Sequence, residues 1–464
     1  MNSTQVQEND IIKQKQLMNE IHTANEACGK KLFAYIDTYG CQQNESDSEK
    51  LRGMLIEMGY EITSDEYTAD IAVINTCAIR ENAENRVLGN VGELVHIKKA
   101  DKKRKVVFCG CLAAVPETVA KVKESYEHVN LLFPPNQLWR FPELLYKTFT
   151  EKKRVFEPDS ENAQIAEGLP QKRDSQIKAW LPIMYGCNNF CSYCIVPFVR
   201  GRERSRDTEA VLSEATSLIE AGYKDITLLG QNVNSYKGVL NFANLLSKIS
   251  AIDGEYLLRF MTSHPKDAGA ELFSAMAGSE KIAKHIHLPF QAGSDRILKL
   301  MNRGYTASQY LDKLIEARKL MPDIVITSDV IVGFPGETEE EFEDTLKLVE
   351  AADFEAMFTF IYSKRPGTPA AKLEDNVTRE KKQVRFERLM TLQNEISEKK
   401  HAAYVGKVIK VLVDGEARSE VYPLKARTNG GRLVHLIGSQ DILGKFIEAK
   451  ITHSNNWSLF GEAL

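Results

Sequence analysis

The sequence predicts an α/β protein of several domains, and three observations carry this prediction. The chain has 464 residues, which is too long for one ordinary domain. Short apolar runs that favour strands alternate with helical patterns over most of its length, as is typical of parallel sheets. After residue 400 the pattern changes to short β-rich runs with Gly and Asn turns, which predicts a small all-β barrel.

The first predicted domain covers residues 30–150. Ser46 and Glu49 fit a capping box, so one helix is expected to begin near Ser46, and a second is expected from about Arg80 to Lys99. Because strands and helices alternate, we expect a parallel sheet. The strands of this sheet are predicted at 32–38, 70–76 and 105–110.

Two polar segments flank this domain. Residues 1–29 predict a flexible N-terminal segment in which Cys28 is an isolated thiol. Residues 151–172 are charged and poor in large apolar side chains, which predicts a linker.

The second predicted domain covers residues 173–400 and ends in a charged helix from about Thr378. It contains six strand-like runs, separated by helical patterns. Six such units can close partly into a barrel or lie as a doubly wound sheet, and periodicity does not choose between them. In both architectures functional groups gather at the carboxyl ends of the strands. The runs begin at residues 181, 225, 256, 285, 324 and 356.

Composition limits the partners and the cellular location that we expect for the protein. A net charge of −4 excludes a general polycation, so any contact with nucleic acid must come from local basic patches. Eight Cys in so long a chain do not form a disulfide scaffold, and the first residues lack the apolar region of a secretion signal. With no apolar run long enough to span a bilayer, we expect a reducing, cytoplasmic location and no membrane partner.

The most informative motif is the CxxxCxxC spacing of Cys187, Cys191 and Cys194. Three thiolates can hold three irons of a cubane 4Fe–4S cluster and leave the fourth iron open to a small molecule. A structural zinc site or a chance cluster is the alternative, but structural zinc uses four ligands and no fourth Cys or His follows closely. The motif therefore favours a cluster with an open iron.

A second set of cysteines follows the three strands of the first domain. Cys41, Cys77 and Cys111 each come directly after a strand, and the carboxyl ends of parallel strands are where ligands converge. Three converging thiolates indicate a second three-Cys cluster. Cys109 lies within its strand, and we assign it to the core.

Six segments together resemble the radical S-adenosylmethionine (SAM) methylthiotransferases, in particular the MiaB type. The resemblance extends from Lys31 to the C-terminus. The segments are TYGCQQNESDSE, NTCAIRENAENRV, GCNNFCSYCIVPFVRGRERSR, LLGQNVNSY, HLPFQAGSD and DVIVGFPGETEEEF.

This resemblance implies a methylthiotransferase domain at 30–150, a partial (βα)6 radical-SAM barrel at 173–400 and an RNA-binding TRAM barrel at 401–464. It implies two [4Fe–4S] clusters and two SAM molecules. One SAM would methylate a sulfur on the second cluster, and the other would be cleaved at the open iron of the first to a 5′-deoxyadenosyl radical. It also implies an external flavodoxin-like reductant, a sulfur source and a monomeric chain.

Within this family, the NTCAIRENAE segment and the Arg-rich GRERSR resemble enzymes that methylthiolate C2 of N6-isopentenyl(dimethylallyl)adenosine at tRNA position 37. Relatives that act on threonylcarbamoyladenosine in tRNA, or on an Asp of a ribosomal protein, are alternatives. From another class, the alternatives are a non-catalytic iron–sulfur electron carrier and an RNA-binding scaffold. Neither of these requires SAM.

Polar residues after the strands of the second domain are the candidate SAM contacts. Tyr193 lies within the Cys loop, where simple packing is the alternative. Ser294 can instead be a helix cap, and Asp329 a structural hydrogen-bond partner. The complete candidate set is Tyr193, Gly230, Gln231, Gln291, Ser294 and Asp329.

Two basic groups are the candidate RNA contacts, because guanidinium groups match phosphate geometry. The first follows the Cys loop, and pairing with acids such as Glu203 is the alternative. The second lies in the C-terminal barrel with His435 and Tyr422 nearby, where an ordinary barrel surface would look similar. The groups are Arg200, Arg202, Arg204 and Arg206, and Lys425, Arg427 and Arg432.

Overall fold

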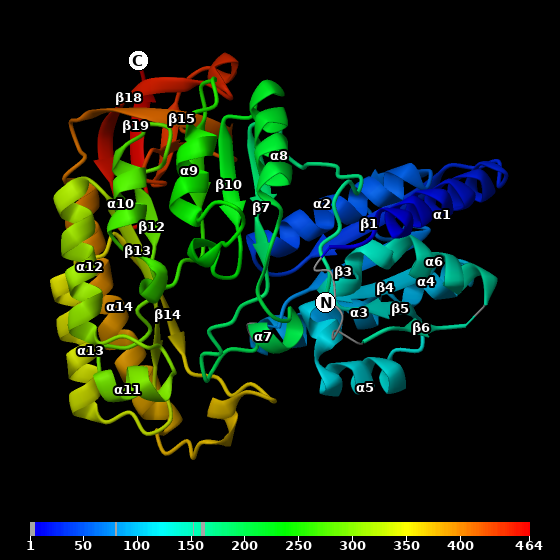
Figure 1. Cartoon of the computed structure of the whole chain (residues 1–464), viewed down its shortest axis with the longest axis horizontal. Coiled ribbons are helices and arrows are strands. Elements are labelled where there is room, and N and C mark those ends of the chain that lie inside the picture. Colours follow the sequence, from blue (N-terminus) through cyan, green and yellow to red (C-terminus); the bar gives the residue numbers. More distant parts are fainter. Residues whose placement is uncertain (1–4, 79–80, 152, 159–162) are drawn as a thin grey trace. The chain divides into compact units, whose positions relative to one another are not determined.

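The computed structural model describes residues 5–78, 81–151, 153–158 and 163–464 (Figure 1). The chain divides into two compact units, which are described separately. The first contains residues 1–174, 184–188 and 194–206, and the second contains 175–183, 189–193 and 207–464. The loop that carries Cys187, Cys191 and Cys194 contributes to both units.

The first unit is a parallel sheet in the order β2-β1-β3-β4-β5-β6. Helices cover both faces, so each face has its own apolar core, one with Met18, Leu51 and Leu144 and the other with Val87 and Val122. The strands are β1 (Leu32–Thr38), β2 (Tyr60–Thr63), β3 (Ile71–Thr76), β4 (Lys105–Gly110), β5 (Val129–Phe133) and β6 (Val155–Phe156). The helices are α1 (Glu8–Glu26), α2 (Gln42–Glu57), α3 (Glu81–Glu93), α4 (Val95–Ala100), α5 (Pro116–Ser125) and α6 (Phe141–Thr150). A short helix α7 (Val196–Val199) and the pair β8 (Met184–Tyr185) and β9 (Arg204–Ser205) complete it.

Both polar flanks are more ordered than their composition predicts. In place of a flexible segment, residues 8–26 form helix α1, whose Met18 and Ile21 are buried in the core. Within 151–172, β6 extends the sheet and the Gln171 side chain donates to Glu49 Oε2 at 2.8 Å. Residues 1–4, 152 and 159–162 of these segments lie outside the described residues.

The predicted start of the first helix is wrong by about one turn. Helix α2 begins at Gln42 with Cys41 at its N-cap, so Ser46 and Glu49 lie within it and are buried. Asn44 fixes the first turn, because its Nδ2 donates to Tyr39 O at 2.7 Å and to Thr76 O at 2.9 Å. The second predicted helix begins outside the described residues at Arg80 and is divided at Leu94 into α3 and α4.

The second unit contains the six predicted strands, and they settle the question between barrel and doubly wound sheet. They form two parallel sheets, β7-β10-β11 and β12-β13-β14, and a parallel bridge between Leu258 and Ile282 links the two. The strands therefore follow chain order without the reversal of a doubly wound sheet, as in a partial barrel. The strands are β7 (Lys178–Pro182), β10 (Asp225–Leu229), β11 (Leu257–Phe260), β12 (His285–His287), β13 (Val325–Val332) and β14 (Ala356–Ile361).

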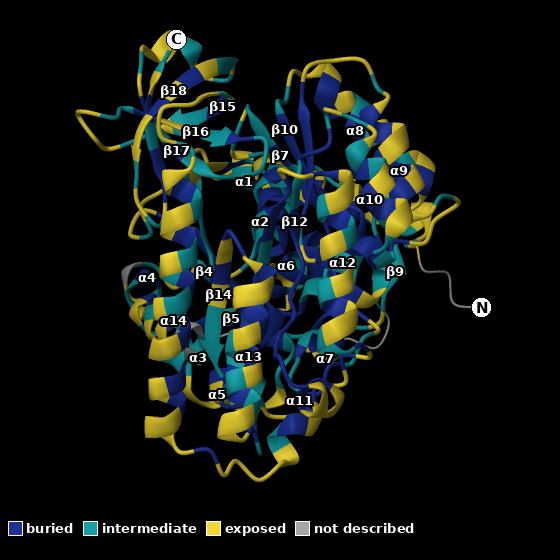
Figure 2. Ribbon diagram, turned by 90° about the vertical axis from the view of Figure 1, so that its left-hand side faces the viewer, coloured by how far each residue is buried: buried dark blue, intermediate teal, exposed yellow. Residues whose placement is uncertain are grey.

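Helices pack on the outside of these strands, with their exposed faces turned away (Figures 1 and 2). Sequence signals fix several helix starts: Thr306 with Gln309, and Thr338 with Glu341, form capping boxes, and Thr378 caps the last helix. The helices are α8 (Thr208–Glu220), α9 (Phe242–Ser250), α10 (Ala270–Ala277), α11 (Asp295–Leu300), α12 (Ala307–Leu320), α13 (Glu339–Ala352) and α14 (Arg379–Ala402).

The C-terminal segment forms a closed barrel in the order β15-β16-β17-β19-β18, as the sequence predicts. It docks at the amino ends of the parallel strands, where Arg259 donates to Thr428 O at 2.9 Å and to Asn429 O at 2.8 Å. Arg259 is itself held by Asp225 at 2.9 Å. The strands are β15 (Val408–Glu416), β16 (Leu424–Thr428), β17 (Leu433–Ile437), β18 (Phe446–Ser454) and β19 (Leu459–Ala463). None of the described helices is long and apolar enough to cross a membrane.

Candidate active site

The structure brings the second set of cysteines together at a topological switch point. In the first unit β1 and β3 are neighbours while β2 lies on the other side of β1, so the connections leave in opposite directions between β1 and β3. Such a crevice, at the carboxyl ends of parallel strands, is where open α/β sheets bind ligands. Cys41 follows β1, Cys77 follows β3 and Cys111 follows β4.

Close approach at Gly40 shows how near two of these residues are. A Cβ atom on Gly40 would lie 2.7 Å from Cys77 Cβ and 3.0 Å from Cys77 Sγ, and Gly40 adjoins Cys41. Burial raises the pKa of the Cys111 thiol, and the charge of Arg200 opposes this while that of Cys41 adds to it. The three thiols thus lie in one environment, in which Cys77 and Cys111 are buried and Cys41 is half-buried.

Arg200 is the main cation of this environment. It is 5% exposed, and its Nε donates to Cys111 Sγ at 3.3 Å. Its Nη2 donates to Asn44 Oδ1 at 2.6 Å and pairs with Asp47 Oδ2 at 2.9 Å. The Cys111 thiol and the Asp47 carboxylate therefore share one guanidinium.

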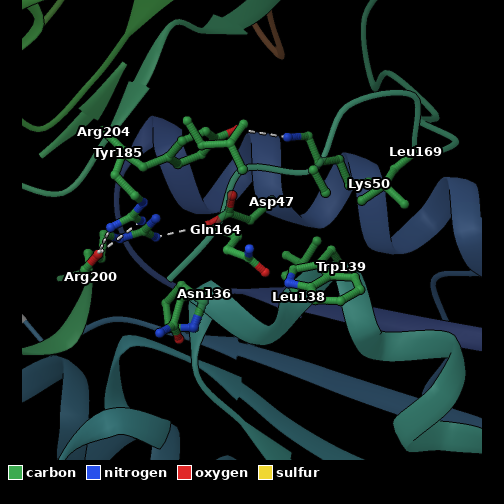
Figure 3. A pocket seen from close by; sticks show the side chains of 13 residues that line it. Asp47, Lys50, Asn136, Leu138, Trp139, Gln164, Leu169, Tyr185, Arg200 and Arg204 are labelled. Atoms are coloured by element: carbon green, nitrogen blue, oxygen red, sulfur yellow. Dashed lines mark hydrogen bonds and ion pairs between the residues drawn. The ribbon is translucent and has the colours of Figure 1, made fainter. Parts of the chain in front are cut away.

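A cavity of about 50 Å³ adjoins Arg200 in the first unit (Figure 3). Lys50, whose Nζ donates to Tyr185 Oη at 2.9 Å, also lines it, as do Trp139 and Arg204. Because about 10–15 Å³ of such volume takes one water, the cavity has room for a few waters and is too small for SAM.

The CxxxCxxC loop is anchored separately in each unit. In the first unit Cys187 is buried, and its N–H donates to Gly201 O at 3.2 Å. In the second unit the turn after α11 holds the middle of the loop: Asn302 Nδ2 donates to Phe190 O at 3.0 Å, and the Ser192 N–H donates to Met301 O at 3.0 Å. Asn302 has φ +58°, a conformation that Asn tolerates better than most residues.

Arg303 in the same turn contacts Cys191. It is 5% exposed and donates from Nη1 to Cys191 Sγ at 3.3 Å. Its other donors reach Tyr305 Oη at 2.9 Å and Pro289 O at 2.7 Å. Sequence reasoning missed this residue, because its contact with Cys191 joins residues 112 positions apart.

Among the described residues, no three or more His, Cys, Asp or Glu side chains are arranged to hold a single metal ion. This finding does not conflict with a cubane, because thiolates that bind different irons stand further apart than the ligands of one ion. Cys109 is buried in the core, as predicted, and Cys28 is exposed.

The candidate SAM residues follow the strands of the second unit. Gly230 is buried and Gln231 half-buried after β10. The pKa of Arg303 is raised above its ordinary value: burial acts to lower it, and Tyr193 is among the groups that outweigh burial and raise it. Asp329 in β13 lies 3.4 Å from His287 Nε2. Ser294 is engaged within the protein, because it caps α11 and donates to Glu341 Oε1 at 2.9 Å.

Within the residues that the structure describes, buried polar atoms without a hydrogen-bond partner mark the same strand ends. Gln291, at φ +71°, leaves Oε1 unsatisfied although the residue is 7% exposed. After β11, Ser263 Oγ and His264 Nε2 are also unsatisfied, and burial lowers the pKa of His264 to about 2. The Lys266 N–H donates to His264 Nδ1 at 3.2 Å, so the Nε2 atom carries the hydrogen. Unsatisfied donors and acceptors of this kind fit SAM, which carries an amine, a carboxylate and ribose hydroxyls.

The first basic group divides into buried and accessible members. Arg200 and Arg206 are buried in ion pairs, with Arg206 bound to Glu167 at 2.6 and 2.7 Å, so the expected RNA contact does not extend to them. Arg202 is exposed. Arg204 is half-buried, donates to Arg202 O at 2.6 Å, and burial lowers its pKa to about 10.

The second basic group divides in the same way. The Arg432 side chain is 8% exposed, lies over the Tyr404 ring and pairs with Glu355 at 3.3 Å, so little of it is open to RNA. Arg427 is partly exposed and pairs with Asp414 at 3.1 Å. Lys425 is exposed.

The chain matches three family descriptions in succession. The Uncharacterized protein family UPF0004 matches residues 33–134, the Radical SAM superfamily matches 181–349 and the TRAM domain matches 402–464. Among solved structures, the radical SAM methyltransferase TsrM from Kitasatospora setae has a TM-score of 0.55 at 17% identity, over 74% of this chain and 75% of that one. At this identity the likeness shows the fold alone.

Curated relatives match almost the whole chain. The tRNA-2-methylthio-N(6)-dimethylallyladenosine synthase of Acetivibrio thermocellus is 46% identical over 97% of this chain and 94% of its own length. That of Thermoanaerobacter sp. (strain X514) is 46% identical over 98% of both chains. With this identity over nearly its full length, the chain belongs to the family of tRNA-2-methylthio-N(6)-dimethylallyladenosine synthases.

Proposed function

We propose that this protein transfers a methylthio group to C2 of N6-isopentenyl(dimethylallyl)adenosine at position 37 of tRNA. The observation that carries the proposal is the gathering of Cys41, Cys77 and Cys111 at the switch point, in a chain that also contains the CxxxCxxC loop. The two Cys triplets supply ligands for two clusters. We assign one cluster to the cleavage of SAM and the other to delivery of the methylthio group. An electron carrier has no need of an open iron in both.

The chain's own residues hold and orient the cofactors. We assign one [4Fe–4S] cluster to each Cys triplet, and SAM to the strand ends near Gln291. The clusters and SAM supply the radical and sulfur chemistry, which side chains cannot perform. Buried polar groups around Gln291 and His264 orient the nucleoside part of the bound SAM and restrict access of water.

The remaining assignments concern domains and partners. We assign the cofactor-binding barrel to 173–400 and the RNA-binding barrel to 401–464. An external one-electron reductant and a sulfur donor complete the reaction, and the protein acts as a monomer.

Anoxic turnover tests the function. Reconstituted protein is supplied with SAM, a strong reductant and, in separate reactions, tRNA carrying isopentenyladenosine, tRNA carrying threonylcarbamoyladenosine, or ribosomal protein. Mass spectrometry of digested products should show a methylthio group only on isopentenyladenosine. Modification of either other substrate would overturn the substrate assignment, and absence of SAM cleavage would favour a non-catalytic scaffold.

An aromatic cluster on the C-terminal barrel supports contact with RNA. The Phe460 ring stacks on His453 at 4.3 Å and on His435 at 5.1 Å between ring centroids, and Tyr422 meets its edge at 5.1 Å. His453 is exposed, and Lys425, also exposed, is the strand partner of His435. Rings beside a cation form the kind of platform on which unpaired bases stack.

We therefore expect Phe460→Ala, which removes the ring that supports the exposed His453 imidazole, to weaken tRNA binding by roughly tenfold, in line with about 1–3 kcal/mol for one stacked base. Fluorescence anisotropy with labelled tRNA at fixed salt measures this effect. Trp457→Ala is the matched control, because Trp457 is 68% exposed on the same barrel but outside the cluster. Equal loss in both variants, or none in Phe460→Ala, would refute the platform.

A further inference from the structure

In each cysteine triplet, a buried arginine donates to one of the sulfurs. Arg303 donates to Cys191 and Arg200 to Cys111, both at 3.3 Å, and both arginines are 5% exposed. Hydrogen bonds to cysteine sulfur and nearby charge are two of the means by which proteins set the reduction potential of an iron–sulfur cluster.

The two arginines differ in what neutralises them. Arg200 forms an ion pair with Asp47, so its charge is compensated within the protein. Within the described parts of the chain, Arg303 has no carboxylate partner: its other acceptors are the Pro289 carbonyl and the Tyr305 hydroxyl. A buried cation with only neutral partners is costly, unless an anion lies against it. The anion available is the Cys191 thiolate, together with any anionic group bound there.

We propose that Arg303 is a positioning residue that raises the reduction potential of the cluster bound through Cys191, and that Arg200 has a smaller effect on the cluster bound through Cys111. The proposal rests on the assignment of a cluster to each triplet. An uncompensated positive charge stabilises the reduced cluster, which carries one more negative charge. Because the Asp47 carboxylate neutralises the Arg200 guanidinium, this pair adds little net charge beside the cluster bound through Cys111. The cluster that must accept an electron and pass it to SAM would thus be the easier one to reduce.

Anaerobic redox titration of the reconstituted full chain, followed by electron paramagnetic resonance without tRNA, tests the proposal. We expect Arg303→Gln to lower the reduced-to-oxidised ratio of the Cys191 cluster on the order of tenfold at fixed potential, about 59 mV for one electron. Arg303→Lys retains the charge but not the planar guanidinium with its several donors, and it should lower this ratio by less. Neither variant should change the other cluster.

The matched control is the double variant Arg200→Gln with Asp47→Asn, which removes a neutral ion pair. It should shift its own cluster much less than Arg303→Gln shifts the other. Retained iron content separates these effects from loss of a cluster, and if Arg303→Gln does not load iron, Arg303→Lys decides. An unchanged potential in the iron-loaded Arg303 variants, or an equal shift in the double variant, would overturn the proposal. Failure to bind two clusters in the unaltered protein would instead contradict the proposed function.

Discussion

Replacement of Cys187, Cys191 and Cys194 together with Ala is expected to abolish cleavage of SAM. No other described group of three thiols is left to take over, because Cys41, Cys77 and Cys111 are assigned to the other cluster and the remaining thiols, Cys28 and Cys109, are only two. Iron should fall from about eight to about four per chain, since one cubane remains. Chemical iron analysis, together with chromatography of 5′-deoxyadenosine after anoxic incubation, measures both outcomes.

Two further variants make this result specific. Replacement of Cys41, Cys77 and Cys111 with Ala should also halve the iron but leave some cleavage of SAM, with no methylthio product. Cys109→Ala is the control, because Cys109 is a buried core thiol two residues before Cys111 and should retain all the iron. If spectroscopy of the Cys187, Cys191 and Cys194 variant still detects two clusters, the assignment of ligands fails.

Local patterns predicted the parts of the fold that depend on local physics. The β3 strand is buried along its whole length, and its first four residues were visible as an apolar run rich in β-branched side chains. Thr378 marked the start of α14 because N-caps are local interactions. The position of three cysteines directly after strands was also a local feature, and the order of strands in the sheet then determined that they meet.

Features that depend on distant partners could not be predicted in this way. Helix α1 reads as a polar segment, yet Gln14 Oε1 accepts from the Glu143 N–H at 3.1 Å, and Met18 is buried. The four arginines after the Cys loop look alike in the sequence. Partners distant in the sequence distinguish the buried Arg200 from the exposed Arg202: Asp47, which is 153 residues away from Arg200, is one, and Asn44 and Cys111 are the others.

Gly110→Ala is expected to destabilise the first unit and to prevent binding of the cluster that is assigned to Cys41, Cys77 and Cys111. Gly110 has φ +91°, and an added Cβ would lie 2.4 Å from Thr76 O and 2.5 Å from Asn75 Oδ1. Neither atom can move away easily. The Thr76 oxygen belongs to the backbone of the neighbouring strand, and the Asn75 side chain is held because its amide donates to Asn44 O at 2.9 Å. Strain and overpacking together should lower the free energy of unfolding by about 2–5 kcal/mol.

The position of Gly110 explains why a methyl group there affects the chemistry. Gly110 directly precedes Cys111, so a shift that relieves the clash moves one of the three thiols at the switch point. We expect urea unfolding of the apoprotein at lower concentration, and about four irons after reconstitution, with cleavage of SAM retained. Gly89→Ala in α3 is the matched control, because nothing lies within 4 Å of its added Cβ, and Ala in a helix should stabilise by about 0.5–1 kcal/mol. Normal stability and full iron in Gly110→Ala would contradict this expectation, because they would show that the strand end accepts the methyl group without displacing Cys111.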